Sequence, residues 1–497
     1  MVVSEVDWDK PIQYALGLPA RRTGIGGFSA RASMVVFLGF IFALVLQLVG
    51  GLGLVAYVVV VPAVGFAVVI SMRWNNRSVA QYAVIVWQSF RRSLVGGELY
   101  VSGEFSRVPG GQRRLPGLLA RTQLLRGRDV LGREFAVVLD RPQKEATVLL
   151  DVEFTGQVKV TQAERNVQTS GWCDFLANLS LSGDIEQVVT VVSTRPGSGM
   201  LVADEVRSIV RDDAPEIARQ VLFEAASAIS TGKPEVDGHI AITVKVSSGV
   251  MKDNEFLGQL ATRVPSWCEM AGWSSMVVKP MSYERAVARV HSFFNPAAEV
   301  DFEQLLLSGE EHGLSWEDAG PGVACVFPRF YFHDGCRSVT WEMREAPRST
   351  FDDMVLHGLC APHQRVARKR VALCYQPYAA GVSARLVEKE HLDALNAANS
   401  SKKVRSAAAE MRLEHTEAAR RAQAKGSQLG RYSLFVTATL AEGDDMSRVV
   451  HDVEQLAAGS SIRLELMKRQ QDAAFQVACG FGQVPWVKAS TPSWLDS

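Results

Sequence analysis

One uncharged, apolar run constrains this chain more than any other feature. From Met34 to Met72 the sequence contains no Asp, Glu, Lys, Arg or His, and Gln47 is the one strongly polar side chain inside the run. A bilayer core about 30 Å thick needs roughly 20 apolar helical residues for one crossing. The run is too long for one crossing, and Gly50 and Gly51 near its middle permit a chain reversal. The pattern therefore predicts a transmembrane helical hairpin over residues 34–72.

Three other interpretations of the run exist. A cleaved signal peptide would show a small-residue cleavage site after one short apolar core, and a buried globular hairpin would show polar positions on its outer face. Neither pattern is present, whereas a re-entrant hairpin stays open. Arginines stand at both ends of the run and none at its turn. The positive-inside rule therefore predicts a multi-pass protein of the plasma membrane with both termini in the cytoplasm.

The remaining composition is that of ordinary globular domains. The chain has 497 residues and a formal net charge of zero, so no general attraction to nucleic acid is expected. Its seven cysteines are scattered, odd in number and form no CxxC pair. That usage is typical of reduced thiols and not of a disulfide framework. About 425 residues follow the run, enough for two or three soluble domains.

Strands and helices alternate through those residues. The C-terminal order of strand, helix, strand and helix is typical of a ferredoxin-like unit with an antiparallel sheet, and a block of the same style starts near residue 323. We therefore predict an α+β fold: an N-terminal transmembrane helical hairpin, then a multi-part cytoplasmic α+β region with antiparallel, ferredoxin-like sheets and a long helical pair. The predicted strands are 135–140, 146–154, 185–194, 239–247, 323–332, 338–345, 365–375, 432–440 and 462–464, and the predicted helices are 76–94, 161–181, 214–230, 255–271, 282–293, 351–359, 446–458 and 467–479.

These elements suggest a division of the chain. The predicted parts are a cytoplasmic N-terminal segment (1–33), the transmembrane hairpin (34–72), a membrane-proximal helix with an Arg-rich connector (73–134), a first cytoplasmic α+β domain (135–320) and a second one (321–497) that carries a helical arm at 384–425. The arm is rich in Ala and charged residues, and the polar cluster NAANSS predicts its break into an antiparallel pair.

Two stretches are candidate contact surfaces. In the arm, Val404, Ala408, Met411 and Ala418 form a narrow apolar stripe at helical spacing. The stripe either packs against the parent domain or projects toward a partner. Seven arginines lie between residues 107 and 133 with only Asp129 opposing them. That segment is either a site for anionic lipid or an acidic partner, or a solvated loop.

The sequence offers no motif for nucleotide chemistry. A phosphate-binding loop needs GxxxxGK[ST]. The stretch RPGSGM at 195–200 lacks the lysine, and TGKPEV at 231–236 has proline where the hydroxyl belongs. We therefore predict neither ATP hydrolysis nor tight binding of magnesium-ATP.

Metal and catalytic candidates are equally weak. Two clusters combine cysteine with histidine at spacings that no recognised zinc site uses, and a carboxylate pair lies in a turn, where such pairs are normally solvated. We predict no catalytic, cofactor-binding or metal-binding residues and no cofactor. The residues of these candidates are Cys325, His333 and Cys336; His357, Cys360 and His363; and Glu317 with Asp318.

Several stretches resemble components of type IV (conjugative) secretion systems. PIQYALGLPARRTGIGG at 11–27, followed by an apolar hairpin, resembles the small two-helix inner-membrane subunit. SVTWEMREAPRSTF (338–351), RKRVALCYQPYAAGVSARLVE (368–388) and RQQDAAFQVACGFG (469–482) resemble the N-terminal, non-ATPase half of the large secretion ATPase. The layout looks like an actinobacterial family in which these two parts are fused without the motor.

The resemblance implies a non-catalytic, membrane-anchored scaffold of a type IV-like secretion or conjugative transfer machine. Such a scaffold would dock a separate ATPase at the cytoplasmic face of the membrane, would work inside a larger complex with other membrane subunits, and would not bind nucleic acid directly. Two alternatives remain: a two-helix membrane subunit of a type VII secretion system, and a membrane-anchored enzyme of unknown activity.

Overall fold

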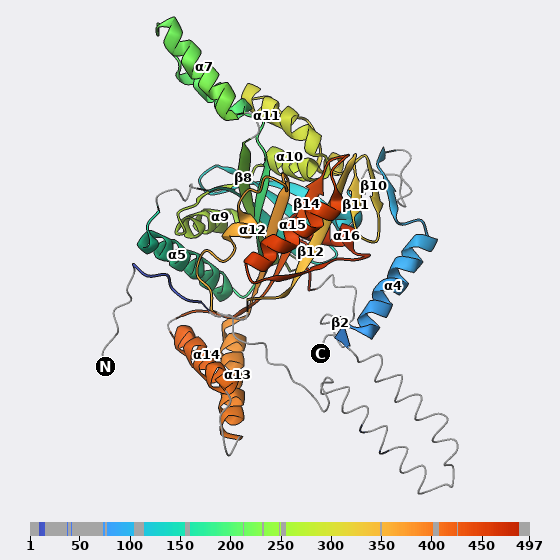
Figure 1. Cartoon of the computed structure of the whole chain (residues 1–497), viewed down its shortest axis with the longest axis vertical. Helices are drawn as coiled ribbons and strands as arrows, with labels where there is room; N and C mark the ends of the chain where they lie inside the picture. Colours follow the sequence, from blue (N-terminus) through green and yellow to red (C-terminus); the bar gives the residue numbers. More distant parts are fainter. Residues whose placement is uncertain are drawn as a thin grey trace. The chain divides into compact units, whose positions relative to one another are not determined.

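The chain forms two compact units, Met1–Gly17 with Leu99–Val484 and Leu18–Glu98 with Pro485–Ser497. In the second unit the described elements are strands β1 (Arg73–Trp74) and β2 (Arg77–Ser78), which pair antiparallel, and helix α4 (Val79–Leu94). Helix α4 confirms the helix predicted at 76–94. The computed structural model describes residues 9–14, 37, 41, 73–74, 77–103, 114–154, 160–211, 213–230, 233–247, 249, 255–347, 350–400, 407–424 and 426–486 (Figure 1).

The predicted transmembrane hairpin requires a correction. In the part of the chain that the structure describes, no helix combines the length and the apolar character needed to cross a membrane. Residues 34–72 lie outside the described residues except for Phe37 and Ile41. The predicted fold class is therefore wrong in its transmembrane hairpin, and the predicted multi-pass plasma-membrane location is wrong as well. The hydropathy of a run measures how unfavourable its transfer into water is. A high value does not by itself require that the run forms a membrane-spanning helix.

One large antiparallel sheet organises the first unit. Its strands follow the order β3-β10-β11-β12-β14-β13-β7-β8-β6-β5-β4, with β15 added on β12 and β9 on β6. The strands are β3 (Leu99–Val101), β4 (Thr122–Arg128), β5 (Glu134–Asp140), β6 (Glu145–Glu153), β7 (Ile185–Pro196), β8 (Pro234–Lys245), β9 (Val277–Pro280), β10 (Val323–Val326), β11 (Tyr331–His333), β12 (Cys336–Glu345), β13 (Lys369–Pro377), β14 (Gly430–Leu440) and β15 (Arg463–Leu466).

Two consecutive repeats with the same order of elements build this sheet. The first repeat, from β4 to α10, has the order β4-β5-β6-α5-β7-α6-α7-β8-α9-β9-α10, and the second has the order β10-β11-β12-α12-β13-α13-α14-β14-α15-β15-α16. The helices are α5 (Gln162–Leu181), α6 (Met200–Ile209), α7 (Glu216–Ser230), α9 (Phe256–Gly272), α10 (Tyr283–Phe294), α11 (Glu299–Ser308), α12 (His357–Cys360), α13 (Ala380–Ser400), α14 (Ala407–Ala424), α15 (Met446–Gly459) and α16 (Gln471–Ala478).

Each repeat contains a ferredoxin-like unit. The strand orders are β9-β6-β8-β7 and β15-β12-β14-β13, with helices in the β-α-β connections. The two units join edge to edge, because β7 pairs antiparallel with β13 from Thr194 opposite Lys369 to Val188 opposite Tyr375. The sheet is therefore continuous across the repeats, with an approximate twofold axis between its two central strands.

The two faces of the sheet carry different layers. Side chains alternate between faces along a strand, and Val188, Val371 and Val436 point to one face with cores formed by α5, α9, α12 and α15. Arg370, the neighbour of Val371, points to the other face, where its guanidinium lies over Phe293 of α10 and Phe475 of α16. Helices α10 and α16 therefore cover the second face.

Helical hairpins extend from the two ends of the sheet. The hairpin α6–α7 connects β7 to β8, and α13–α14 connects β13 to β14. Because β7 and β13 run antiparallel side by side, their C-terminal ends lie at opposite ends of the sheet, and so do the two hairpins (Figure 1). We call α6–α7 the first arm and α13–α14 the second arm; the second arm confirms the helical pair predicted at 384–425.

Most predicted elements of the first unit are present, with three kinds of error. The strand predicted at 323–332 is two strands, β10 and β11, which pair antiparallel, and α6, α11 and β9 were not predicted. The helix predicted at 351–359 is only the single turn α12, because the chain there instead forms turns and a bridge between Phe351 and Tyr14. The Arg-rich connector was not expected to contain a strand, yet β4 lies within it and pairs with β5. The alternation of Thr122, Leu124 and Arg126 is too short to stand out among seven arginines.

A close contact of α5 predicts an unusual result for a helical glycine. A β-carbon built on Gly171 would lie 2.3 Å from the carbonyl oxygen of Trp273, which follows α9. Ala normally stabilises a helix interior by about 1 kcal/mol over Gly, but here the backbone must move. We expect Gly171→Ala to lower the free energy of unfolding by about 1–3 kcal/mol, measured by chemical denaturation. Gly258→Ala in α9, where nothing lies within 4 Å, is the control and should not destabilise the chain.

Candidate functional site

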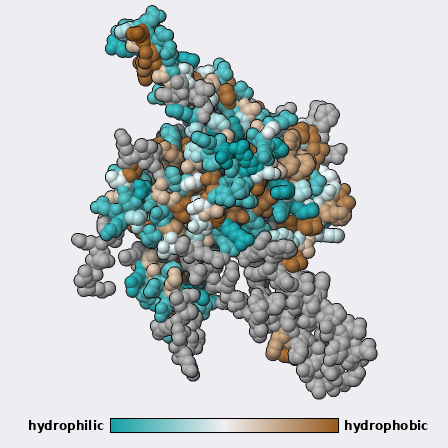
Figure 2. Space-filling view, viewed as in Figure 1, coloured by the Kyte–Doolittle hydropathy of each residue, from teal (hydrophilic) through white to brown (hydrophobic). Residues whose placement is uncertain are grey.

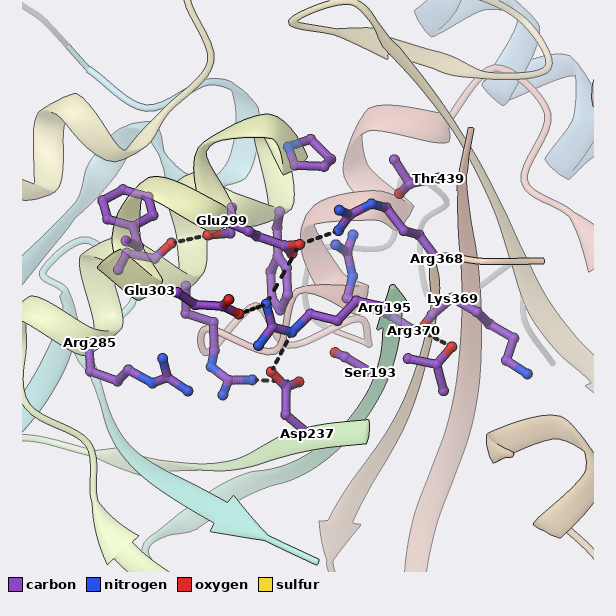
Figure 3. A pocket seen from close by; sticks show the side chains of 17 residues that line it. Ser193, Arg195, Asp237, Arg285, Glu299, Glu303, Arg368, Lys369, Arg370 and Thr439 are labelled. Carbon is purple, nitrogen blue, oxygen red and sulfur yellow. Dashed lines mark hydrogen bonds and ion pairs between the residues drawn. The ribbon is translucent and has the colours of Figure 1, made fainter. Parts of the chain in front are cut away.

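A pocket of about 70 Å³ lies on the α10–α16 face of the sheet, beside the junction of the two repeats (Figure 3). Ser193 and Arg195 on β7 and Arg370 on β13 reach it because alternate strand residues share a face. Helices α10 and α11 supply the remaining wall. The charged residues that line the pocket are Arg195, Asp237, Arg285, Arg289, Glu299, Glu303, Arg368, Lys369 and Arg370.

Ion pairs connect the walls of this pocket. Arg195 Nη2 lies 2.8 Å from Glu235 Oε2, and its Nη1 lies 2.5 Å from Glu303 Oε1. Arg368 Nη1 donates to Glu299 Oε2 at 2.5 Å. Since α11 carries both Glu299 and Glu303, these bonds tie the helix to the ends of the two central strands (Figure 3).

A second set of ion pairs lies deeper. Arg289 of α10 donates from Nη2 to Asp151 Oδ1 at 3.0 Å and from Nη1 to Asp237 Oδ1 at 3.2 Å. Its side chain is 4 % exposed. Burial alone would raise the pKa of Asp237, but Arg289, Arg195 and Arg285 offset burial and lower it. Asp237 is therefore an ionised acceptor that holds α10 on β8.

Arg370 is the exception in this network. Its Nε and Nη2 are buried and have no hydrogen-bond partner among the described residues. The guanidinium lies between two aromatic rings, 4.1 Å from the ring centroid of Phe293 and 4.7 Å from that of Phe475. Burial lowers the pKa of Arg370, yet an arginine keeps its charge at all physiological pH values. Arg370 therefore brings to the pocket a buried positive charge that no described carboxylate bonds.

Two buried histidines lie in the same layer as the pocket. His239 Nε2 contacts the carbonyl oxygens of Cys479 at 3.1 Å and Gly480 at 3.3 Å, and its ring stacks on Phe481. His333 is bonded to the carbonyl of Phe294 and to Ser338 Oγ. Burial lowers the pKa of His239 to about 3 and that of His333 to about 4. Both side chains are therefore neutral structural groups near pH 7.

The structure places the metal candidates in the fold without forming a site. His333 is held by Phe294 and Ser338, and Cys336 lies opposite it in the β11–β12 pairing. Cys360 is partly buried on α12, and desolvation raises the pKa of its thiol to about 11. Within the described residues no group of three or more His, Cys, Asp and Glu side chains is arranged to hold a metal ion.

The remaining sequence candidates have structural partners. Ser315 Oγ donates to Asp318 Oδ2 at 2.6 Å, which caps a short 3₁₀ helix. In the Arg-rich segment, Arg126 pairs with Glu284 at 2.7 Å and Arg133 with Asp129 at 2.9 Å. In the stretch 195–200, Ser198 donates to Glu303, and Arg195 lines the pocket. Thr231 and Gly232 of the other loop candidate lie outside the described residues.

The first arm exposes a large apolar surface. Ile217 is 75 % exposed and Val221 is 58 % exposed, and Leu222 and Phe223 beside them are also exposed. Figure 2 shows these hydrophobic side chains gathered on α7. A soluble helix normally turns its large apolar side chains toward a core, whereas these four of α7 are exposed to solvent.

The second arm is closed on its inner side. Val387, His391, Ala394 and Ala398 of α13 are buried against α14. From the predicted stripe, Met411 is 51 % exposed, and Ala418 is exposed as well. Val404 lies outside the described residues. The described stripe residues therefore do not form the contact between the two helices.

The sequence does not predict the pocket, because the residues that line it are far apart along the chain. A signal was present, since Arg368 and Arg370 are two residues apart in a predicted strand and must share its face. The sequence does not show that β13 lies beside β7, which brings Ser193 opposite Arg370.

The chain was also compared with known proteins. No protein-family model matches it, and no curated protein has a similar sequence at a significant level.

Proposed function

We propose that this chain is a non-catalytic scaffold subunit of a type IV-like secretion or conjugative transfer machine, and that it docks a separate ATPase. The observation that carries the proposal is the set of large apolar side chains that α7 exposes to solvent, Ile217, Val221, Leu222 and Phe223. Two further features support it: the arms extend from opposite ends of one sheet, and three sequence stretches resemble the N-terminal, non-ATPase half of the large secretion ATPase. A sheet with two separated arms suits a part that holds other subunits at fixed positions.

The test is recovery of the ATPase with the tagged full-length chain from its native cells. We expect Ile217→Asp with Val221→Asp to lower the recovery of a Walker-motif ATPase at least tenfold. The reason is that each apolar side chain buried at a contact contributes about 1.5–3 kcal/mol. Leu181→Asp is the matched control, because Leu181 is 66 % exposed on α5, outside both arms, and should change nothing.

A second variant decides which arm is used. Met411→Asp with Ala418→Asp places charges on the exposed stripe of α14. Loss of the ATPase in this variant alone would assign docking to the second arm. Normal recovery with both variants, each folded by circular dichroism, would refute docking through the arms. Recovery of a type VII ATPase in place of a type IV one would assign the chain to a type VII machine and would support its role as a scaffold.

A further inference from the structure

The pocket at the repeat junction contains an excess of unused hydrogen-bond donors. Ser193 Oγ and the Nε and Nη2 atoms of Arg370 are buried without a hydrogen-bond partner among the described residues, as is Nε of Arg289. Ser193 and Arg370 are also directly opposite each other in the β7–β13 pairing, so both face the same space. Buried donors without acceptors are costly and rare.

The missing partner must supply acceptors and negative charge. Guanidinium groups bind carboxylate and phosphate oxygens through paired N–H bonds, and Arg368 and Arg285 also line the pocket, with side chains 27 % and 39 % exposed. The nearby carboxylates do not satisfy Arg370, because Glu299 and Glu303 bond Arg368 and Arg195, and Asp237 bonds Arg289.

The pocket has room for a small anion. Its volume of about 70 Å³ is several times what a single water needs, so a tetrahedral oxyanion fits inside it. Thr439, Ser292 and Arg368 also line the space, so polar residues stand on several of its sides. Figure 3 shows Thr439 and Arg368 among them.

We propose that this pocket binds a phosphate group, with Arg370 and Ser193 as its central partners. The group is either free inorganic phosphate or the terminal phosphate of a larger molecule whose remainder lies outside the pocket. The site is independent of the scaffold function proposed above, because it lies on the sheet and not on an arm.

Titration of the full-length chain with sodium phosphate, against sodium chloride of equal ionic strength, tests the proposal. We expect heat of binding in calorimetry and a melting temperature that rises with phosphate concentration. Ser193→Ala should weaken binding about 3- to 10-fold, and Arg370→Gln should weaken it about 10- to 100-fold, as the loss of a neutral and of a charged hydrogen bond implies. Arg211→Gln, at an exposed ion pair, is the control and should bind as the wild type does.

The outcomes separate the two sources of phosphate. Binding of inorganic phosphate that depends on Arg370 assigns the free ion. Binding of metal-free ATP that depends on Arg370, with no response to phosphate at about 10 mM, assigns the terminal group of a larger ligand. No response of the wild-type chain to either probe would overturn the proposal and leave Arg370 stabilised by Phe293 and Phe475 alone. If Arg370→Gln does not fold, Ser193→Ala decides, and unchanged affinity there overturns the assignment.

Discussion

Acidification from pH 8 to pH 5 is expected to lower the free energy of unfolding of the full-length chain by about 4 kcal/mol. The cause is burial of His239 and His333, whose pKa values fall from 6.5 to about 3 and about 4. Between the folded and unfolded pKa values, the unfolded chain binds protons that the native chain does not. Stability is therefore complete above about pH 6.5 and is lost as the pH falls through this window.

Chemical denaturation at intervals between pH 8 and pH 5 measures this loss. Near pH 5 the two histidines together should produce a slope of about 2.7 kcal/mol per pH unit. Glu235 and Glu299, whose pKa values burial raises, act in the opposite direction. His291, whose pKa burial lowers, acts in the same direction as the two histidines. The double variant His239→Gln with His333→Gln should flatten the profile. A variant with the wild-type slope would show that other groups titrate.

Arg289→Met is expected to lower the free energy of unfolding by about 3–5 kcal/mol, because it removes one partner from a buried ion-pair set. The substitution keeps the length of the side chain but leaves Asp151 and Asp237 without the donors that now lie 3.0 Å and 3.2 Å from them. Asp237 then has only Arg195 and Arg285 to offset its burial, so α10 should loosen from the sheet.

Arg211→Met is the matched control for this measurement. Arg211 pairs with Asp213, but the two side chains are 79 % and 68 % exposed, so the loss should stay within about 1 kcal/mol. A second variant, Asp151→Asn with Asp237→Asn and Arg289→Met, removes all three charges together. If it is as unstable as Arg289→Met alone, the cost arises from lost packing and not from unpaired carboxylates.

Much of the first unit could be read from periodicity. The alternation in β8 and β14 and the caps at Thr161 and Asp445 set the local structure, and local structure depends mainly on neighbours in the sequence. The pairing of β7 with β13 depends on residues far apart along the chain, so periodicity does not contain it. The candidate site was missed for the same reason, since Ser193, Asp237 and Arg370 meet only across that pairing.

The sequence by itself determined most of the strands and helices, the two blocks of similar style and the helical pair, because backbone preference and hydrophobic period act over a few residues. The tertiary structure alone decided that the two blocks form one sheet about an approximate twofold axis, and that α7 presents its apolar side chains to solvent. The tertiary structure also decided which charged side chains have a bonding partner. The sequence does not show whether an arginine such as Arg370 lies beside a carboxylate or between two phenyl rings. Only the packing of distant segments determines its surroundings.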